Sequence, residues 1–425
     1  MDNSTAIRCI ASLGVGVAVS TGHPVGIAAA IVMPPLAMGQ QTHLGTYESA
    51  FCYYAGASWP VIPAVRNFFG PSASVFEGII AWLTAAALLA AVWPLAWTKR
   101  QNQLVWRVPL VLLATVVPPL GLIGWASPIT AAGLLFPGTA WFGLFAVVLL
   151  CAGLCIKAWT SYTALVAVIL GIFAHLNYPD PLPPFGWESL NTHFGAIAHG
   201  PTDLIREYTV AQSIQNRARS SRARVLVFPE MVVPRWTAAT DLFWQQTLAR
   251  LSASGKTILV GAGLPDTSQL HKSSPSLASY DFGAAAAALR GARLPIRIHI
   301  EDTDSGDSDP YRNAIVIRGK QTAIFAQRVP VPFGMWHPFG VGGVPLNISG
   351  PGVIGIANQR AAILICYEQL LTWPVLVSML DHPTILLAVA NDYWVERTAI
   401  PRYQATVARA WGRLFGIPVI SAVNR

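Results

Sequence analysis

The sequence predicts a bundle of membrane-spanning α-helices followed by an α+β domain of alternating strands and helices. Of the 425 residues, 53% are hydrophobic and only 11% are charged, whereas ordinary soluble domains carry roughly 25% charged residues. Long apolar stretches fill the chain up to residue 175, and short β-rich runs alternate with helical ones from residue 176 onward. We therefore expect two domains, a transmembrane bundle over 1–175 and a layered domain over 176–425.

The first domain is expected to contain seven membrane spans. A bilayer core needs about 20 apolar residues per helix. The chain breaks around Gly22-His23-Pro24, so residues 5–38 are expected to hold two short spans, and the aromatic, glycine-rich stretch 47–66 is a weaker candidate. The four clearest spans are 75–97, 107–125, 134–156 and 158–175.

The positions of the basic residues predict the orientation of the bundle. Lys99, Arg100 and Arg107 flank one loop, and Lys157 lies in another. Positive loops favour the cytoplasmic side, and an N-terminus inside with seven spans places both loops there. The 176–425 domain is then expected on the periplasmic face, and a change of one span would reverse this.

The second domain is expected to have alternating strands and helices. The segments 242–254 and 400–416 have helical periodicity, and Gly416 stands where a C-cap would. This order is typical of an α/β or α+β layered domain. The expected strands are 222–228, 256–263, 313–319, 361–367, 384–390 and 417–423.

Several functional classes find no support. The formal charge is +8, but the basic residues are scattered along the chain, and we expect no direct nucleic-acid binding. The five cysteines form no disulfide or zinc pattern. The acidic stretch 301–310 has Asn313 where a calcium loop would close with Glu, and the SGKT at 254–257 has Arg250 in place of the first glycine of a phosphate loop. No metal or cofactor is expected.

Polar groups follow three runs of the second domain. Glu230 follows VLVFP, residues 325–336 form a turn region, and Cys366 follows AAILI. A carboxylate and a thiol that project into one cleft are the parts of a thiol acyl-transfer site, in which Glu takes the thiol proton and the thiolate attacks a carbonyl. The alternative is that Cys366 is a buried, inert small hydrophobe, as free cysteines commonly are.

A family resemblance adds to this interpretation. The motifs FPE, PVPFG, ICYE, VANDYWV and RLFGIPVISAVN resemble those of the nitrilase superfamily of carbon–nitrogen hydrolases. YYAGASW (53–59) and YRNAIVIRG (311–319) are similar to segments of its apolipoprotein N-acyltransferase type, which also begins with a membrane bundle. The phrases GWASPITAAGLLFPGTAWFGL (124–144) and VPVPFGMW (329–336) resemble more specifically the TraB-type conjugal-transfer proteins of bacterial plasmids.

The resemblance implies an αββα sandwich and a Glu–Lys–Cys triad. The family's Glu falls on Glu230 and its nucleophile on Cys366. The lysine, five residues before the Pro of PFG, falls on Gln327, so that a neutral amide replaces an ammonium. Loss of a positioned charge at such a site costs on the order of a hundred-fold in rate. The supporting positions are Tyr367, Glu368, Asn391 and Trp394.

Other substitutions bear on whether the site is active. Met335 stands where the acyltransferases carry Glu. Arg328 adjoins Gln327 but should point to the opposite face of a strand, and Lys320 would need a slip in register. The sequence stops at Arg425, before the position of the acyltransferases' last membrane helix.

Two hypotheses follow for a protein of the bacterial inner membrane. In the first, it is a membrane-anchored acyltransferase or amidase that acts on a lipid or amide through Cys366. In the second, it is a non-catalytic element that supports plasmid transfer. The resemblance implies membrane lipids and conjugation-apparatus proteins as partners. MWHPFG (335–340) and Trp394 predict an apolar entrance beside the bilayer, although these tryptophans could instead fill the core or lie at headgroup level.

Overall fold

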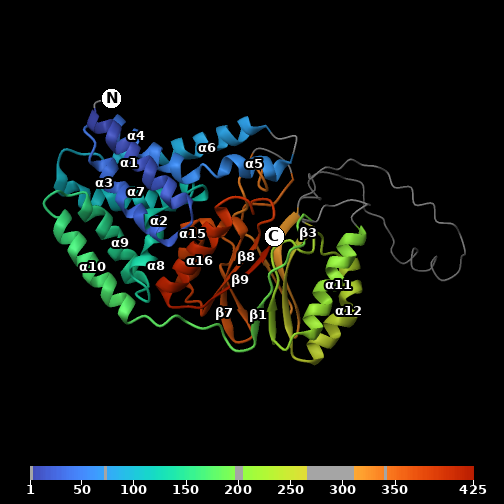
Figure 1. Cartoon of the computed structure of the whole chain (residues 1–425). Helices are drawn as coiled ribbons and strands as arrows, with labels where there is room; N and C mark the ends of the chain where they lie inside the picture. The colour runs from blue at the N-terminus through green and yellow to red at the C-terminus, as the bar shows by residue number, and fades with distance from the viewer. Residues whose placement is uncertain (1–2, 71–73, 197–203, 266–310, 339–341) are drawn as a thin grey trace, which may run out of the picture.

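A computed structural model of the chain describes an N-terminal helical region followed by two β-sheets that carry helices on their outer faces (Figure 1). The described residues are 3–70, 74–196, 204–265, 311–338 and 342–425. The acidic stretch 301–310 therefore lies outside the described residues.

The helical region consists of helices shorter than most of the expected spans. Its 3₁₀ turns are η1 (Ala29–Val32), η2 (Trp93–Leu95), η3 (Gln101–Gln103), η4 (Leu120–Leu122) and η5 (Pro128–Ala131). Its α-helices are α1 (Asn3–Ser20), α2 (Pro24–Ala28), α3 (Met33–Met38), α4 (His43–Ser58), α5 (Val61–Phe69), α6 (Val75–Ala90), α7 (Leu104–Val116), α8 (Ala132–Leu135), α9 (Trp141–Leu154) and α10 (Thr160–Leu176).

One described helix, Val75–Leu95, is long and apolar enough to cross a membrane by length and composition. Three shorter apolar helices, Pro24–Met38, Trp141–Leu154 and Thr160–Leu176, fall below that length. The stretch 107–125 does not form one helix, because α7 ends at Val116, just before two consecutive prolines. The helical character of the region matches the expectation, and the count of seven spans stays a prediction.

The remainder of the chain forms the two sheets and their helices. The strands are β1 (Trp187–Ser189), β2 (Val225–Val227), β3 (Thr257–Pro265), β4 (Tyr311–Gly319), β5 (Ala323–Ala326), β6 (Val353–Ile356), β7 (Gln359–Ile365), β8 (Ile385–Asn391) and β9 (Val419–Asn424). The helices are α11 (Leu204–Ser220), α12 (Ala238–Ala253), η6 (Cys366–Leu370), α15 (Thr372–Leu380) and α16 (Ile400–Phe415).

The sheets pack face to face. The first has the order β1-β2-β3-β4-β5 and the second the order β6-β7-β8-β9. Strands β1, β2 and β3 are parallel to one another, as are β7, β8 and β9. Side chains alternate between the faces of a strand, so Val225 and Val227 join Ile363 and Ile365 in the core between the sheets, whereas Leu226 lies on an outer face.

Helices complete the layers on both outer faces. On the first sheet, Ile214 of α11 and Trp244 of α12 belong to the same buried cluster as Leu226. On the second sheet, α15 and α16 pack against the outer face, and the helical region lies beyond them in the same buried cluster (Figure 1). The order of layers is helix, sheet, sheet, helix, with the helical region as an additional layer.

Helix α16 joins the helical region to the sheets. The backbone N–H groups of Gly138 and Ala140 donate to the carbonyl oxygens of Arg413 and Leu414, each at 2.7 Å. A Cβ atom on Gly133 would overlap the carbonyl oxygen of Ala410, so the two backbones meet at a position that only glycine permits. The two regions are therefore packed as one body along α16.

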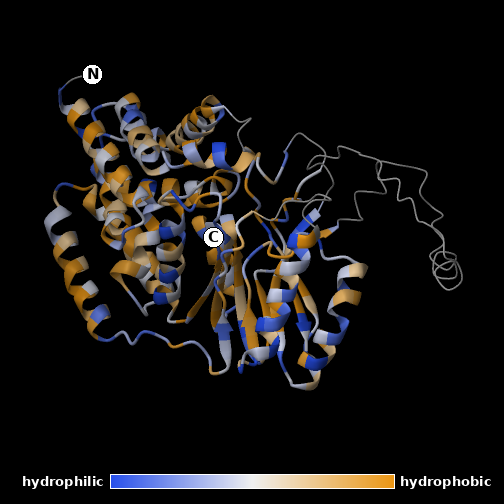
Figure 2. Ribbon diagram, turned by 45° about the vertical axis from the view of Figure 1, so that its right-hand side comes forward, coloured by the Kyte–Doolittle hydropathy of each residue, from blue (hydrophilic) through white to orange (hydrophobic). Residues whose placement is uncertain are grey.

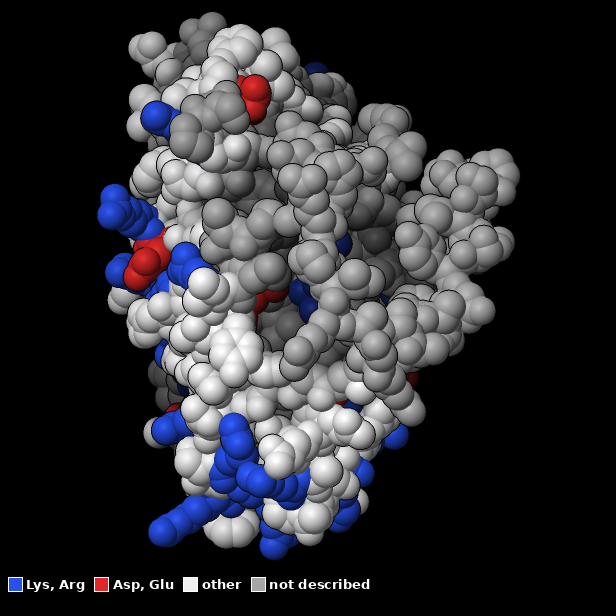
Figure 3. All heavy atoms as spheres, turned by 90° about the vertical axis from the view of Figure 1, so that its right-hand side faces the viewer, with Lys and Arg blue, Asp and Glu red and all other residues white. Residues whose placement is uncertain are grey.

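The fold gathers basic residues that are scattered in the sequence. Lys256 donates from Nζ to the carbonyl oxygens of Arg219 and Ser221, and the N–H of Lys320 donates to the carbonyl oxygen of Lys256 at 2.8 Å. Figure 3 draws the side of the molecule that lies on the right in Figure 1, and it shows blue Lys and Arg side chains gathered on the lower part of that side. Hydrogen bonds of their backbones or side chains place five basic residues at this end of the first sheet: Arg217, Arg219, Arg224, Lys256 and Lys320.

The close contact at Gly133 predicts the effect of a small substitution. Gly133→Ala should lower the melting temperature of the detergent-solubilised protein, because overpacking of a tight contact costs about 1–3 kcal/mol. Gly14→Ala in α1 is the matched control, because an added Cβ there meets nothing within 4 Å. Equal melting temperatures for both variants and the wild type would contradict tight docking along α16.

Candidate active site at the ends of the strands

Four chain segments bring polar side chains together where strands of both sheets end. Glu230 follows β2, Gln327 follows β5, Cys366 follows β7 and Asn391 ends β8. The carboxyl ends of β2, β7 and β8 lie at one edge of the sandwich, which is where ligands bind in many α/β proteins. The structure thus brings Glu230, Gln327 and Cys366 into one buried cluster.

Hydrogen bonds hold the Glu230 carboxylate from several sides. Asn313 Nδ2 donates to Oε1 at 2.5 Å, and the backbone N–H of Asn391 donates to Oε2 at 2.9 Å. The nearby thiol of Cys366 also lowers the pKa of Glu230. Burial nevertheless raises the pKa of Glu230 to about 7, against the lowering effect of these donors, and the charge of Asp392 raises it further.

Cys366 leaves its strand in an unusual backbone conformation. Its φ is +50°, in the left-handed region that costs a side-chain-bearing residue roughly 1–2 kcal/mol. Gln404 Nε2 of α16 donates to its carbonyl oxygen at 3.1 Å and helps to hold the turn. Burial, followed by the charges of Glu230 and Asp392, raises the pKa of the Cys366 thiol well above its ordinary value. The thiol is therefore protonated at neutral pH.

Both ends of the Gln327 side-chain amide form hydrogen bonds within the protein. Nε2 donates to the carbonyl oxygen of Ile365 at 3.1 Å, and Oε1 accepts from Asn313 Nδ2 at 2.9 Å. The amide links the turn before Cys366 to the asparagine that holds Glu230. Among the described residues, no Lys or Arg forms an ion pair with Glu230.

Arg328 and Lys320 lie elsewhere. The side chain of Arg328 is fully buried, with Nε 3.5 Å from Glu368 Oε1. Glu368 Oε1 also accepts from the backbone N–H groups of Arg328 at 2.7 Å and Val329 at 3.0 Å, and Oε2 accepts from the N–H of Ile365 at 3.0 Å. Glu368 thus joins the two chain segments from behind. Lys320 follows the far end of β4, away from Asn313.

Tyr367 and Trp394 face the helical region. Tyr367 Oη donates to the carbonyl oxygen of Leu122 at 2.9 Å. The ring of Trp394 meets Phe68 of α5 edge-on, with ring centroids 5.2 Å apart. Met335 is buried. Aromatic groups therefore connect the surroundings of the site to the helical region, whereas residues 339 and 340 of the expected entrance lie outside the described part of the chain.

Sequence reasoning missed four polar residues of this cluster. Asn313 interrupts the apolar strand β4, and that interruption was the available signal. Asp392 is buried directly after β8, and its Oδ1 has no hydrogen-bond partner among the described residues. Gln404 and Asn424 are also buried. Asn424 Nδ2 donates to Asn391 Oδ1 at 2.8 Å and so fixes the end of β8.

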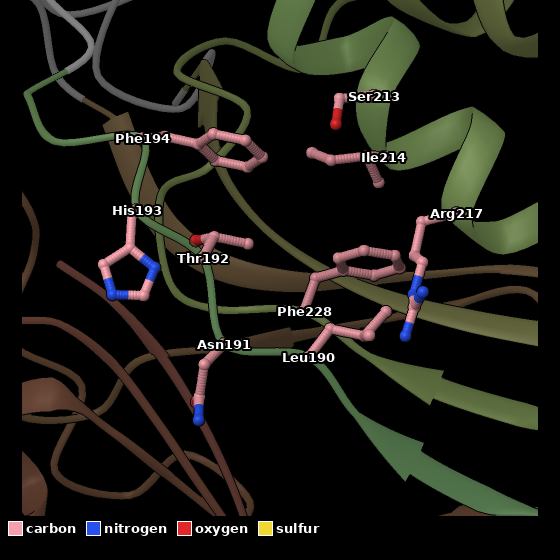
Figure 4. Close-up of a pocket in the computed structure, with 9 residues that line it drawn as sticks. All are labelled: Leu190, Asn191, Thr192, His193, Phe194, Ser213, Ile214, Arg217 and Phe228. Atoms are coloured by element: carbon pink, nitrogen blue, oxygen red, sulfur yellow. The ribbon is translucent and has the colours of Figure 1, made fainter.

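A cavity of about 330 Å³ lies beside this cluster, between the segment after β1 and helix α11 (Figure 4). Thr192 Oγ1 donates to Asn424 Oδ1 at 2.8 Å, which connects one wall of the cavity to the Asn424–Asn391 hydrogen bond. Glu230 and Cys366 do not line it. The lining residues are Leu190, Asn191, Thr192, His193, Phe194, Ser213, Ile214, Arg217 and Phe228.

The chain resembles conjugal-transfer proteins over nearly its full length. It is 28% identical over 420 residues to a probable conjugal transfer protein TraB of Sinorhizobium fredii strain NGR234, which covers 98% of this chain and 97% of the relative. It is 29% identical over 438 residues to the conjugal transfer protein TraB of Agrobacterium fabrum strain C58, which covers 99% and 92%. No protein-family model matches the chain.

Solved structures with similarity to this chain include carbon–nitrogen hydrolases. One is a carbon–nitrogen hydrolase from Helicobacter pylori G27, with a TM-score of 0.35 and 12% identity over 56% of this chain and 72% of that chain. Another is an amidase of Nesterenkonia AN1 from the nitrilase superfamily, with a TM-score of 0.33 and 10% identity over 57% and 78%.

The buried carboxyl of Asp392 predicts a pH-dependent stability. Burial raises its pKa to about 7, against the opposing charge of Arg425, whereas an unfolded Asp has a pKa near 3.9. The folded state then binds the proton more tightly, so the free energy of unfolding falls as pH rises from about 4 to 7. Asp392→Asn should remove this loss, on the order of 2–4 kcal/mol, and raise the melting temperature at pH 8 more than at pH 5. The exposed Asp381→Asn is the control, and equal shifts at both pH values would contradict the prediction.

Proposed function

We propose that this protein supports conjugal plasmid transfer at the bacterial inner membrane as a membrane-anchored, nitrilase-like protein whose Glu230–Gln327–Cys366 site no longer turns over. The observation that carries the proposal is the amide of Gln327, which is bound at both ends to Ile365 and Asn313. The names of the two full-length relatives support the conjugal role.

The electrostatics of the site support a loss of turnover. Thiol acyl transfer needs a thiolate and a positive or donating group at the developing oxyanion. Burial and two carboxyls raise the pKa of the Cys366 thiol, and the amide N–H group of Gln327 that could have served as a donor is committed to Ile365. Each unit by which a thiol pKa exceeds the ambient pH lowers the thiolate fraction about tenfold.

The exposed surface of the helical region supports membrane anchoring. Helix α10 exposes nine large hydrophobic side chains over its length: Tyr162, Leu165, Val166, Val168, Ile169, Leu170, Ile172, Phe173 and Leu176. Figure 2 shows α10 as a mostly hydrophobic helix on the outside of the molecule. Soluble proteins rarely expose a contiguous apolar surface of this kind. In our proposal, residues 1–175 form the membrane domain with about seven spans, lipids cover it, and residues 176–425 lie in the periplasm.

An active enzyme is the second candidate, and one observation favours it. Cys366 adopts a left-handed φ of +50°, and its thiol lies near enough to Glu230 for each group to shift the pKa of the other. Strained backbones of this kind cluster at functional sites. In this alternative, Glu230 accepts the thiol proton, and Cys366 attacks an ester or amide carbonyl of a lipid or amide substrate to form a thioester. The alcohol or amine then leaves with the proton that Glu230 returns to it. Conjugation-apparatus proteins remain the proposed partners, and we expect no direct nucleic-acid binding under either alternative.

Restoring a cation should activate the thiol. Gln327→Lys should raise the rate of Cys366 alkylation by iodoacetamide at pH 7 by at least about tenfold, because a nearby ammonium stabilises the thiolate. Gln327→Met is the matched control, since it also removes both amide hydrogen bonds but adds no charge. Cys366→Ser gives the background from the other cysteines. Equal rates for the Lys and Met variants would mean that position 327 does not act on the thiol.

Plasmid transfer should not require the thiol. A host that carries Cys366→Ser in place of the wild type should transfer its plasmid at a frequency within about threefold of the wild type. The reason is that the uncharged serine hydroxyl fills the same place as the thiol. Deletion of the gene should abolish transfer. Immunoblots must show equal protein levels. A hundred-fold loss with normal levels would favour the active enzyme.

The orientation of the anchor can be tested independently. A reporter fused after residue 180 should be active when it requires the periplasm and inactive when it requires the cytoplasm, because Lys99, Arg100 and Lys157 hold their loops inside. The opposite pattern would refute the proposed orientation and imply a different span count.

A further inference from the structure

Exposed basic side chains gather at the end of the first sheet where β2 and β3 begin. The candidate site lies at the carboxyl ends of the strands, so this surface is separate from it. Hydrogen bonds of Lys256 bring three chain segments together here. These segments contain eight basic residues and no acidic residue: 215–224, 248–257 and 317–323. The surface therefore carries a strong positive charge, which Figure 3 shows as blue side chains.

The end of helix α11 explains some of these charges. Basic residues in the last turn of a helix offset its partial negative charge, and Arg217 and Arg219 stand in the last turn of α11. Arg217 also pairs with Glu188 at 3.1 Å. Lys256 Nζ donates to the carbonyl oxygens of Arg219 and Ser221. These three basic residues therefore stabilise the fold at the place where α11 ends.

Arg222, Arg224 and Lys320 have no comparable role. All three are exposed, and none of them forms an ion pair with an acidic residue of the described chain. Backbone hydrogen bonds nevertheless fix their positions. The N–H of Arg224 donates to the carbonyl oxygen of Gly186 at 2.7 Å, and the N–H of Lys320 donates to that of Lys256 at 2.8 Å. The fold thus holds three cations at the surface without an acidic partner among the described residues.

Two exposed apolar side chains lie in the segment that adjoins these cations. This segment leads from α10 to β1 along the lower edge of the molecule in Figure 1. Phe185 in it is 95% exposed, more than any other large hydrophobic side chain of the described chain, and Leu182 is 85% exposed. A Cβ atom built on Gly186 would lie 3.5 Å from Cγ of Arg224. Phe185 therefore stands one residue from a direct contact with the basic surface.

Several observations favour a protein as the ligand of this surface. Arginine and aromatic residues are enriched at the centres of protein interfaces. Single-stranded nucleic acids are bound by aromatic side chains on which their bases stack, and the three basic segments contain no aromatic residue. Phosphates bind at helix N-termini, whereas α11 and α12 both end here. The helical region packs on the second sheet, whereas this surface belongs to the first.

We propose that this surface docks a partner protein through an acidic segment that also carries an apolar side chain. The carboxylates of the segment pair with Arg222, Arg224 and Lys320, since a planar guanidinium can donate two parallel hydrogen bonds to one carboxylate. The apolar side chain of the segment covers Phe185. The inference rests on the proposed function in that it names the chemistry of the proposed partner proteins, but no residue of the candidate site takes part in it.

Binding of a synthetic acidic peptide tests this proposal on the detergent-solubilised full-length protein. The probe is a short fluorescent peptide with the repeat Glu-Glu-Leu-Glu, and the reference peptide carries Gln in place of Glu. At low salt the acidic peptide should bind at least about tenfold more tightly than the reference, and the difference should shrink as the ionic strength rises. Arg222→Glu/Arg224→Glu should weaken its binding at least about tenfold, and Phe185→Ser about threefold or more, at unchanged melting temperatures.

Arg397→Glu/Arg409→Glu is the matched control, because both arginines are exposed and lie outside this surface. It should change the affinity by less than about twofold, since distant charges are screened. Equal binding of the two peptides, or unchanged binding by Arg222→Glu/Arg224→Glu, would overturn the proposal. An oligodeoxythymidylate that binds more tightly than the acidic peptide would also overturn it, in favour of a nucleic acid. A dimer that the same double variant dissociates would overturn it in favour of a second copy of the chain.

Plasmid transfer separates this proposal from the inactive site. A host with Arg222→Glu/Arg224→Glu should transfer its plasmid at least about 30-fold less often at normal protein levels, because the partner no longer docks. Cys366→Ser should bind the acidic peptide as the wild type does. Normal transfer by the double variant would overturn the docking surface and leave the inactive site standing. Turnover of an acyl donor through Cys366 would refute the inactive site and leave the docking surface standing.

Discussion

The hydrogen bond from Asn313 to Glu230 is the interaction on which the rest of the site depends. Asn313 Nδ2 lies between two acceptors, Glu230 Oε1 and Gln327 Oε1, and so joins the carboxylate to the amide. Gln327 in turn holds the carbonyl oxygen of Ile365, directly before the thiol. A chain of neutral amides therefore fixes the positions of the carboxylate and the cysteine without supplying a positive charge.

This arrangement fixes the positions of Glu230 and Cys366 but does not favour the thiolate form of Cys366. Glu230 and Cys366 lie near enough for each to shift the pKa of the other, and the left-handed turn at Cys366 is held by Gln404. Positioning alone does not create a thiolate, because burial beside two carboxyls favours the protonated thiol. In our proposal the site holds its residues in place without turning over, because Gln327 supplies a neutral amide where the family resemblance implies a lysine.

The strands that carry hydrophobic periodicity could be predicted from sequence, whereas short or atypical elements could not. All six expected strands are present, but the expected strand 361–367 ends at Ile365, which puts Cys366 in a turn. Strands β1, β5 and β6 have only three or four residues, too few to show a period. Helix α11 was missed because it is rich in polar residues, and α15 because a nine-residue apolar run is equally typical of a strand.

Some residues of the candidate site could likewise be predicted from the sequence, whereas the hydrogen-bond network that holds them could not. The proximity of Glu230 and Cys366 was expected from the family resemblance, and strand alternation predicted that Arg328 would face away from Gln327. The network behind them could not be predicted, because Asn313 lies 83 positions from Glu230 and only the fold brings them together. The burial of Asp392, which sets its pKa, likewise depends on the packing of both sheets.

A direct titration of the Cys366 thiol tests the central claim, that the site holds its nucleophile protonated for lack of a cation. Thiolate absorbance in the ultraviolet would be followed against pH in the full-length protein that retains Cys366 as its single cysteine, with Cys366→Ser as the blank. The account predicts a pKa well above the ordinary thiol value near 8.5, because burial and the carboxyls of Glu230 and Asp392 oppose ionisation. A thiolate already formed at neutral pH would contradict it.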